Sequence, residues 1–329
     1  MNQFNLKPKS LCIAVILPAY NEELTIESTI EAFNKELPNA FIWVVNNLST
    51  DATETLASNK LKSLNCNGGV LNEYRKGKGN AVRRAFMDTD ADIYILADAD
   101  MTYPAEKIHD LLFPVIKNNA DMVVGDRHSD GHYAAENKRS LHGFGNHLVK
   151  FLVNKLFHAR LVDIMSGYRV FSRRFVKSYP ILVDGFEIET DLTLHALDKR
   201  FRVIEIPVDY KDRPEGSVSK LNTFADGARV LFTIAQILRF YKPLKFFSLI
   251  GLIFCLLGFI AGFSPVHDYL ISGYVYHLPF AVLAVGFEIL SMVSFSVGLI
   301  LDSINYHHKM LFEARLLDMT HFRSGVDGN

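Results

Sequence analysis

The sequence predicts an α/β protein with a mainly parallel sheet, helices on both faces of that sheet, and a membrane anchor at the C-terminal end. Two observations carry this prediction. Apolar runs rich in β-branched residues alternate with stretches of helical period in the first half of the chain, and two long apolar segments follow residue 243. The 329 residues include 35 basic and 36 acidic side chains. This balance gives no overall attraction to nucleic acid, so we expect no nucleic-acid partner.

The positions of strands and helices follow from these patterns. The strands are expected at residues 11–17, 41–45, 92–97, 121–125 and 202–210. The helices are expected at residues 22–36, 51–64, 79–87, 105–118 and 140–157. Strands that alternate with helices at this spacing form parallel sheets covered on both sides. Ligands of such sheets bind beyond the carboxyl ends of the strands, so the polar residues that follow each strand are the candidates for a site.

Two segments are long and apolar enough to cross a membrane as helices. Residues 244–263 contain one charge, Lys245, and residues 278–301 contain one charge, Glu288. Each segment reaches about 30 Å as a helix, which matches the hydrocarbon core of a bilayer. A buried helical hairpin in a soluble domain is the alternative interpretation.

The charges around these segments predict their orientation. Basic residues lie before the first segment and after the second, whereas the connecting loop, Ser264–His277, has no Lys or Arg. By the positive-inside rule, we expect a multi-pass protein of the cell inner membrane with the N-terminal domain and the C-terminal end in the cytoplasm. A carboxylate is costly in hydrocarbon, so Glu288 is expected to face a partner helix or another subunit. With the glycines of the first segment, it makes a homo-oligomer an expectation.

The chain is expected to have four parts. They are a cytoplasmic domain at residues 1–221, an amphipathic interfacial helix at 222–243, the transmembrane hairpin at 244–301 and a cytoplasmic tail at 302–329. The amphipathic helix carries one apolar face from Phe224 to Leu238, which is typical of a helix on a membrane surface. A surface helix of a soluble domain is the alternative. The three scattered cysteines exclude a disulfide framework and a zinc site.

Asp98-Ala99-Asp100 directly follows an apolar strand. Two carboxylates one residue apart can hold Mg²⁺ or Mn²⁺ against a diphosphate, because these hard cations take oxygen ligands and keep several waters. Acidic residues are also common in surface turns. The position at the carboxyl end of a strand favours the metal-binding interpretation.

A basic segment with two glycines, Lys76–Asn80, opens a predicted helix. Glycines let backbone N–H groups approach a phosphate, and the N-terminus of a helix favours anions. No Ser or Thr follows the lysine, which excludes a Walker A loop. A solvated basic turn is the alternative.

Two polar, glycine-containing loops lie further along, Asp163–Arg169 and Arg213–Lys220. The second precedes the amphipathic helix by a few residues. Its cationic and hydroxyl side chains would suit a phosphate held close to the bilayer. Attraction to anionic lipid head groups is the less specific alternative.

Seven stretches together resemble the family 2 glycosyltransferases of GT-A fold, specifically the polyprenyl-phosphate glycosyltransferases related to dolichyl-phosphate mannose synthase. The matching stretches are Ile16–Glu23, Val44–Thr53, Gly77–Ala85, Leu96–Pro104, Val123–Arg127, Asp163–Arg173 and Ile206–Asn222. They occur in the order of the family and cover nearly the whole cytoplasmic part. Two C-terminal spans also fit the bacterial undecaprenyl-phosphate sugar transferases of this group.

The resemblance implies a membrane-bound, inverting glycosyltransferase. One sugar would pass from a nucleotide-sugar, a UDP-hexose or UDP-N-acetylhexosamine, to a polyprenyl phosphate, with release of the nucleoside diphosphate. The cofactor would be Mg²⁺ or Mn²⁺. The acceptor phosphate already carries negative charge near neutral pH, so a strong general base is dispensable.

The resemblance also implies roles for individual residues. The nucleotide would be bound by Pro18, Ala19, Tyr20, Glu22, Asn46, Lys78, Asp98 and Ala99. The metal would be held by Asp98 and Asp100. The catalytic set would be Asp98, Asp100, Arg127 and Asp163. The acceptor phosphate would be bound by Arg213, Ser217, Ser219 and Lys220.

Two residues depart from the family pattern, and the role of one acidic cluster is open. Asn46 stands where the family usually has Asp; its amide oxygen can still accept a hydrogen bond from a base, but the charge is lost. Thr102 stands where several relatives carry a Gln near the metal, so a water would fill that position. The acidic residues from Glu187 to Asp191 lie where sugar-transferring relatives place a catalytic carboxylate, although a solvated helix start is equally consistent.

Two other functions compete with this one. Gln236 and Arg239 come close to the Gln-x-x-Arg-Trp signature of processive polysaccharide synthases, but two spans are too few to enclose a polymer channel. A non-catalytic membrane protein that keeps a nucleotide-binding fold is favoured by Asn46 alone.

Overall fold

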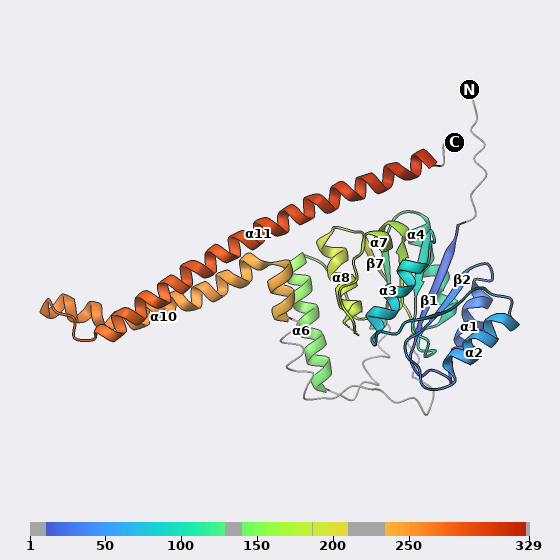
Figure 1. Ribbon diagram of the computed structural model, residues 1–329, viewed down its shortest axis with the longest axis horizontal. Coiled ribbons are helices and arrows are strands. Elements are labelled where there is room, and N and C mark those ends of the chain that lie inside the picture. Colours follow the sequence, from blue (N-terminus) through green and yellow to red (C-terminus); the bar gives the residue numbers. More distant parts are fainter. Residues whose placement is uncertain (1–10, 129–139, 186, 210–233, 327–329) are drawn as a thin grey trace, which may run out of the picture. The chain divides into compact units, whose positions relative to one another are not determined.

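The computed structural model describes residues 11–128, 140–185, 187–209 and 234–326 (Figure 1). The chain forms two compact units, Met1–Asn222 and Thr223–Asn329. The first unit contains a sheet with its covering helices, and the second contains two long helices.

The sheet of the first unit has seven strands in the order β3-β2-β1-β4-β6-β5-β7. The strands are β1 (Ile13–Ala19), β2 (Phe41–Asn46), β3 (Asn67–Asn72), β4 (Ile93–Leu96), β5 (Met122–Asp126), β6 (Arg169–Ser172) and β7 (Val203–Pro207). β6 runs antiparallel to both of its neighbours, β4 and β5, and the other described pairings are parallel. The prediction of a mainly parallel sheet is confirmed.

Helices cover both faces of this sheet. The helices are α1 (Ile26–Glu36), α2 (Thr53–Ser63), α3 (Lys78–Asp88), α4 (Ile108–Ile116, after a 3₁₀ turn at Ala105–Lys107), α6 (Ser140–Phe157), α7 (Arg173–Ser178) and α8 (Ile188–Asp198). The main core cluster joins Leu17 of β1 to apolar side chains of α1, α2 and α4. On the other face, Phe86 of α3 packs edge-on against Tyr94 of β4, with ring centroids 5.7 Å apart. Ile16 and Leu17 point to opposite faces, and neither has any exposed surface.

Three elements were not predicted: β3, β6 and α7. A helix start around Glu187 was one of two interpretations, and α8 begins there. β6 is four residues long and begins with Arg169, a charged side chain with no exposed surface. β3 is an edge strand that contains two adjacent glycines, so it shows no apolar alternation. Periodicity needs several apolar residues in one element, and these elements supply too few.

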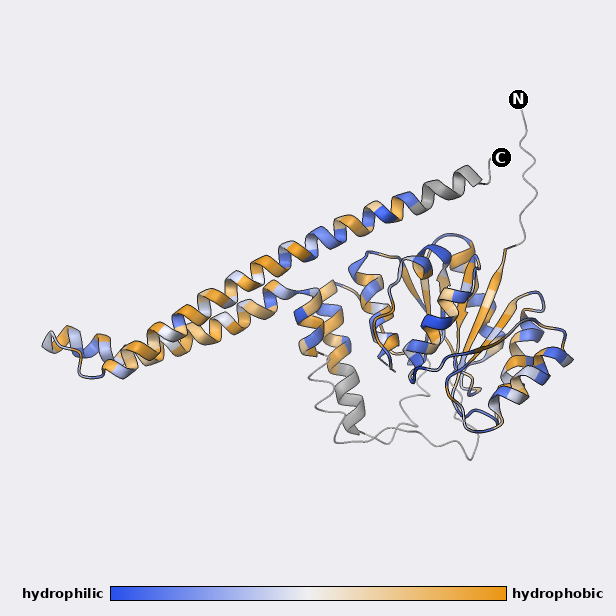
Figure 2. Cartoon of the chain, viewed as in Figure 1, coloured by the Kyte–Doolittle hydropathy of each residue, from blue (hydrophilic) through white to orange (hydrophobic). Residues whose placement is uncertain are grey.

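The second unit contains two helices that are long and apolar enough to cross a membrane. They are α10 (Pro243–Ser272) and α11 (Leu278–Val326), and Figure 2 shows that apolar residues surround most of α10 and the first part of α11. The expected loop Ser264–His277 is wrong over most of its length, because α10 continues past Pro265 to Ser272. A proline removes one helical hydrogen bond without enforcing a turn. The helix ends instead at Gly273, whose φ of 67° is the left-handed conformation that reverses the chain.

Glycines allow α10 and α11 to pack closely. A Cβ atom at Gly251 would stand 2.9 Å from the ring of Phe295, and one at Gly258 would collide with the carboxylate of Glu288. Glu288 therefore faces a partner helix, as expected, and that helix is α10 of the same chain. α11 continues into the residues of the expected cytoplasmic tail and ends at Val326.

The predicted interfacial helix lies only partly within the described residues. Residues 234–241 are helical, and the helix breaks at Lys242, where φ is −138° and ψ is 59°. Residues 222–233 lie outside the described part.

Candidate active site

The polar residues that follow β1, β2 and β4 meet at one edge of the sheet, as predicted. β1 lies between β2 and β4, and all three run parallel. Ala19 pairs with Asn46 at the ends of β1 and β2, and the backbone N–H of Asn47 donates to the carbonyl of Ala19. Pro18 and Ala19, which are predicted to bind the nucleotide, are thus the last two residues of β1 and lie next to the end of β2.

The segment after β4 is fixed by its backbone. The carbonyl of Ala99 accepts hydrogen bonds from the hydroxyls of Thr25 at 2.8 Å and Thr29 at 3.2 Å. Asp100 is 2% exposed, and its Oδ1 accepts from the Thr102 hydroxyl at 2.6 Å. Thr102 thus supports Asp100 directly. Two threonines of the α1 region therefore position the candidate metal-binding segment, a role that the sequence did not reveal.

Lys78 links three elements of the site. Its ammonium, at the start of α3, contacts Asp98 Oδ1 beyond β4 and Glu189 Oε1 in the first turn of α8, the latter at 2.5 Å. Burial would lower the pKa of the Lys78 ammonium, but the two carboxylates raise that pKa above its usual value, so it stays charged. Glu189 is itself buried. Glu189 lies in the first turn of a helix, as one of the two interpretations of these acidic residues expected, but its side chain is not solvated.

The predicted phosphate cradle at Lys76–Asn80 is not formed by the backbone amides of its glycines, because these amides already have partners within the protein. The N–H of Gly77 donates to Asn47 Oδ1 at 2.8 Å, and the N–H of Gly79 donates to the carbonyl of Asp184 at 2.9 Å. A Cβ atom at Gly77 or Gly79 would collide with the backbone at 183–184, so these glycines permit close packing within the protein. The Lys78 side chain, and not a nest of amides, brings the positive charge to the site.

Asn46 and Asn47 organise the neighbouring turns. The amide group of Asn46 donates to Glu54 at 3.1 Å and to Asn72 at 3.0 Å, and its oxygen accepts from the N–H of Ser49. Asn47 donates to the carbonyl of Arg75 at 2.7 Å. Both N–H bonds of Asn46 are thus used within the protein, which leaves its carbonyl oxygen as the group that can accept a further hydrogen bond.

The turn after β1 is joined to the turn after β2. Asn21 has a left-handed φ of 54°, and its side-chain oxygen accepts from the N–H of Thr50 at 2.8 Å. The N–H of Glu22 donates to the Thr53 hydroxyl at 2.9 Å. Tyr20 and Glu22, predicted to bind the nucleotide, are half-buried beside these contacts.

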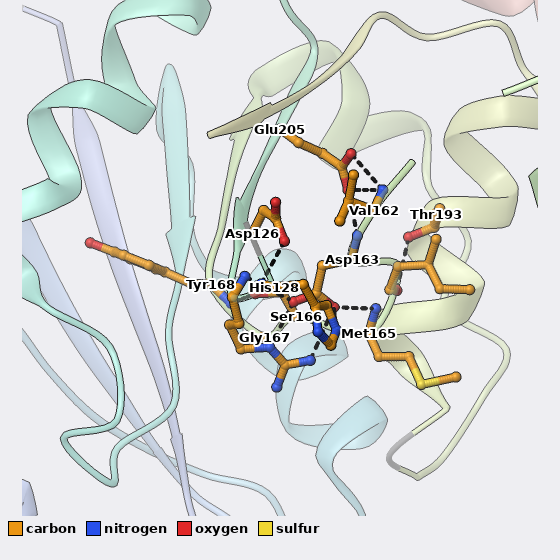
Figure 3. A network of polar contacts seen from close by, with 12 residues as sticks. Asp126, His128, Val162, Asp163, Met165, Ser166, Gly167, Tyr168, Thr193 and Glu205 are labelled. Atoms are coloured by element: carbon orange, nitrogen blue, oxygen red, sulfur yellow. Dashed lines mark hydrogen bonds and ion pairs between the residues drawn. The ribbon is translucent and has the colours of Figure 1, made fainter. Parts of the chain in front are cut away.

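Arg127 and Asp163 form a second charged group, and Figure 3 shows Asp163 in its polar network. The Arg127 guanidinium donates to both oxygens of Asp163, at 2.7 and 3.0 Å. Burial would raise the pKa of the Asp163 carboxyl, but the guanidinium holds that pKa below its usual range. Glu205 accepts from the backbone N–H groups of Val162 and Asp163 at 2.7 and 2.8 Å. Two predicted catalytic residues thus lie together, with Asp163 as an ionised partner that orients Arg127.

Arg169 belongs to a polar loop that the sequence singled out, but its role in forming the site was not predicted. It has no exposed surface, and its guanidinium donates to the carbonyls of Ser166 and Ile164 and to the hydroxyl of Thr193, at 2.8 to 2.9 Å. These bonds tie the loop before β6 to α8. The same loop carries Gly167, where an added Cβ would stand 2.7 Å from Asp98 Oδ2.

The oxygen atoms of Asp98 and Asp100 suit a hard divalent cation in their chemistry. Within the described ranges, no group of three or more His, Cys, Asp or Glu side chains is placed to hold a metal ion. A cation here would therefore take further ligands from waters and from a bound diphosphate. The predicted acceptor residues Arg213, Ser217, Ser219 and Lys220 lie outside the described residues.

The sheet and its helices resemble those of solved enzymes. A crystal structure of glucosyl-3-phosphoglycerate synthase from Mycobacterium tuberculosis with Mn²⁺, UDP and phosphoglyceric acid superposes with a TM-score of 0.52 at 22% identity. The match covers 70% of this chain and 78% of that one. The GT-A-like fold expected from the sequence is confirmed.

Relatives match at the sequence level as well. Glycosyltransferase AglJ of Haloferax volcanii is 30% identical over 245 residues, which covers 74% of this chain and 77% of the relative. Dolichol-phosphate mannosyltransferase of Pyrococcus furiosus is 26% identical over 249 residues, which covers 73% and 68%. The model of glycosyl transferase family 2 matches residues 14–179, which include Lys78, Asp98, Asp100, Arg127 and Asp163. The chain is a glycosyltransferase and belongs to family 2.

Proposed function

We propose that this glycosyltransferase moves one sugar from a nucleotide-sugar to a polyprenyl phosphate at a membrane, with inversion at the anomeric carbon. The observation that carries the proposal is the charged group Lys78, Asp98 and Asp100 at the carboxyl edge of the sheet, in a chain that also has two apolar helices. The name of the Pyrococcus relative supports a lipid phosphate as acceptor. The solved synthase, crystallised with UDP, supports a UDP-hexose or UDP-N-acetylhexosamine as donor.

The reaction needs no strong general base, because the acceptor phosphate is already negatively charged. An oxygen of the acceptor phosphate forms a bond to the anomeric carbon, and the bond between that carbon and the donor diphosphate breaks. The main task is then to stabilise the charge on the departing nucleoside diphosphate. Lys78, with its pKa raised by two carboxylates, stays protonated and can donate hydrogen bonds to that diphosphate. Arg127, held by Asp163, offers a second fixed cation.

A divalent cation would be held by Asp98 and Asp100, and when bound it supplies positive charge next to the diphosphate. Mg²⁺ and Mn²⁺ both accept the oxygen ligands that these residues offer. The Mn²⁺ in the solved synthase supports this assignment.

The second unit would anchor the enzyme beside its lipid acceptor. The outward side chains of α10 and α11 are large and apolar; Phe259, Ile260 and Met292 are each at least 70% exposed. Exposed apolar surface of this kind suits lipid contact. We place the catalytic unit on the cytoplasmic side of the inner membrane from the flanking basic residues, with Arg213, Ser217, Ser219 and Lys220 at the acceptor phosphate.

The test is transfer of a radiolabelled sugar by the purified full-length protein. UDP- and GDP-sugars are supplied one at a time with undecaprenyl phosphate and Mg²⁺ or Mn²⁺, and the lipid product is analysed for chain length. One sugar on the lipid supports the proposal. A polymer would favour a processive synthase that uses Gln236 and Arg239, and no turnover of any donor would favour a non-catalytic protein.

A further inference from the structure

Lys78 and its two carboxylates, Asp98 and Glu189, form an ion triad whose arrangement affects cation binding. The Asp98 side chain is the most exposed of the three, at 27%. The ammonium contacts Asp98 Oδ1 and Glu189 Oε1. The Lys78 side chain is 9% exposed and that of Glu189 is 7% exposed, so little water reaches this pair. The ammonium therefore serves as the counter-ion of both carboxylates.

The backbone of Gly167 lies close to the other oxygen of Asp98. A Cβ atom at Gly167 would stand 2.7 Å from Asp98 Oδ2 and 3.1 Å from Lys78 Nζ. The N–H of Gly167 donates to the Tyr103 hydroxyl at 2.9 Å, which fixes this backbone in place. One oxygen of Asp98 is thus taken by the ammonium, and Gly167 restricts one side of the other, so a cation that needs this carboxylate competes with Lys78.

Electrostatics strengthens this competition. A divalent cation on Asp98 would lie close to the Lys78 ammonium, and like charges repel strongly where water is scarce. Glu189 lets Lys78 release Asp98 without losing its buried counter-ion. A diphosphate would add negative charge beside both cations. The binding of cation and nucleotide should therefore be coupled through the position of Lys78.

We infer that Lys78 is the counter-ion of Asp98 in the donor-free protein, and that a divalent cation binds Asp98 only when the ammonium moves to Glu189 and the donor diphosphate. The inference rests on the proposed function, because it requires a divalent cation and a diphosphate as ligands. It assigns Glu189 as a positioning residue for Lys78. Asp98 would then stay closed to cations until the donor arrives.

The test measures Mn²⁺ binding to the full-length protein in detergent by electron paramagnetic resonance, without donor and with UDP or GDP. Wild type should bind Mn²⁺ weakly alone and at least about tenfold more tightly with its nucleotide. Lys78→Met should bind Mn²⁺ about tenfold more tightly than wild type without nucleotide, and the nucleotide should then add less. Lys76→Met is the matched control, because this exposed lysine lies two residues away, and it should behave as wild type.

Lys78→Met leaves Glu189 buried without its cation, so its thermal unfolding is compared with wild type. The double variant Lys78→Met with Glu189→Gln removes both charges and should also bind Mn²⁺ more tightly than wild type without nucleotide. If both folded variants bind donor-free Mn²⁺ no better than wild type, the inference is overturned and the proposed function stands. If neither wild type nor any variant binds Mn²⁺ under any condition, both the inference and the divalent cation of the proposed function are contradicted.

Discussion

The two ends of the sheet use buried ion pairs in opposite ways. At the amino ends of β5 and β7, the carboxylate of Asp121 accepts from Arg174 at 2.6 Å and from Arg202 at 3.3 Å. At the carboxyl ends, the single ammonium of Lys78 is shared by Asp98 and Glu189. One acid faces two bases at the first end, and one base faces two acids at the second.

We interpret the ion pairs of Asp121 as stabilising the fold and those of Lys78 as serving the reaction. Asp121 also accepts from the backbone N–H of Arg202 at 3.0 Å, and its carbonyl accepts from Ser172 at 2.9 Å, so it joins β5, β6 and β7. Its charge is fully compensated within the protein. The carboxyl end keeps an excess of negative charge and an ammonium with two partners, which suits the exchange of ions with a ligand. The comparison predicts that variants at the two ends fail in different assays.

The largest effect is expected at the carboxyl end. Asp100→Ala should reduce sugar transfer by roughly a thousandfold or more, because it removes a ligand of the proposed cation at a site where charge develops. The protein should stay folded and bound to membranes, as measured by its unfolding midpoint and by flotation with vesicles. Asp110→Ala, on an exposed face of α4, is the control and should retain activity. Transfer at the wild-type rate by Asp100→Ala would contradict the assignment of Asp100 as a ligand of the cation.

At the amino end the expected loss is in stability. Asp121→Asn should lower the free energy of unfolding by about 1–3 kcal/mol, because two guanidinium groups lose their buried carboxylate. Both arginines are partly exposed and can be hydrated, which limits the cost. Urea unfolding measures the loss, and the KM for the donor should not change. A raised KM with unchanged stability would contradict the division between the two ends.

Gly167→Ala tests how closely the carboxyl end is packed. The added Cβ would stand 2.7 Å from Asp98 Oδ2, so either the loop or the ion triad must shift, and transfer should fall about 10- to 100-fold. Gly69→Ala on β3 is the matched control, since its Cβ would meet only the Trp43 ring at 3.7 Å. Equal activity of the two variants would show that the contact between Gly167 and Asp98 has no role in transfer.

Much of the fold was predictable because its signals are local. The central strands are runs of buried apolar residues, and Asp98 and Asp100 follow one of them directly. The partners of these residues were harder to find. Glu189 reaches Lys78 across 111 residues of sequence, and Arg169 lies in a strand that carries no apolar pattern. Such contacts depend on tertiary packing, which neither spacing nor residue type encodes.

The phosphate cradle was mispredicted for a related reason. Glycines near a helix start are consistent with a ligand close to the backbone and equally with a close segment of the protein. At Gly77 and Gly79 the close segment is the backbone at 183–184. Residue type indicates that something lies close, and only the structure identifies it.

The smallest effect concerns Glu73, which accepts both a backbone and a side-chain hydrogen bond from Arg75 beside the site. The Arg75 side chain lowers the pKa of Glu73 to about 2, below its ordinary value of 4.5. Because the folded state holds the carboxyl ionised, this pair stabilises the fold fully above pH 4.5 and loses its contribution as the pH falls toward 2. Glu73→Gln should therefore lower the urea midpoint slightly near pH 7, and its difference from wild type should shrink as the pH falls from 4.5. A difference that stays constant down to pH 3 would mean that the pair acts through packing and not through charge.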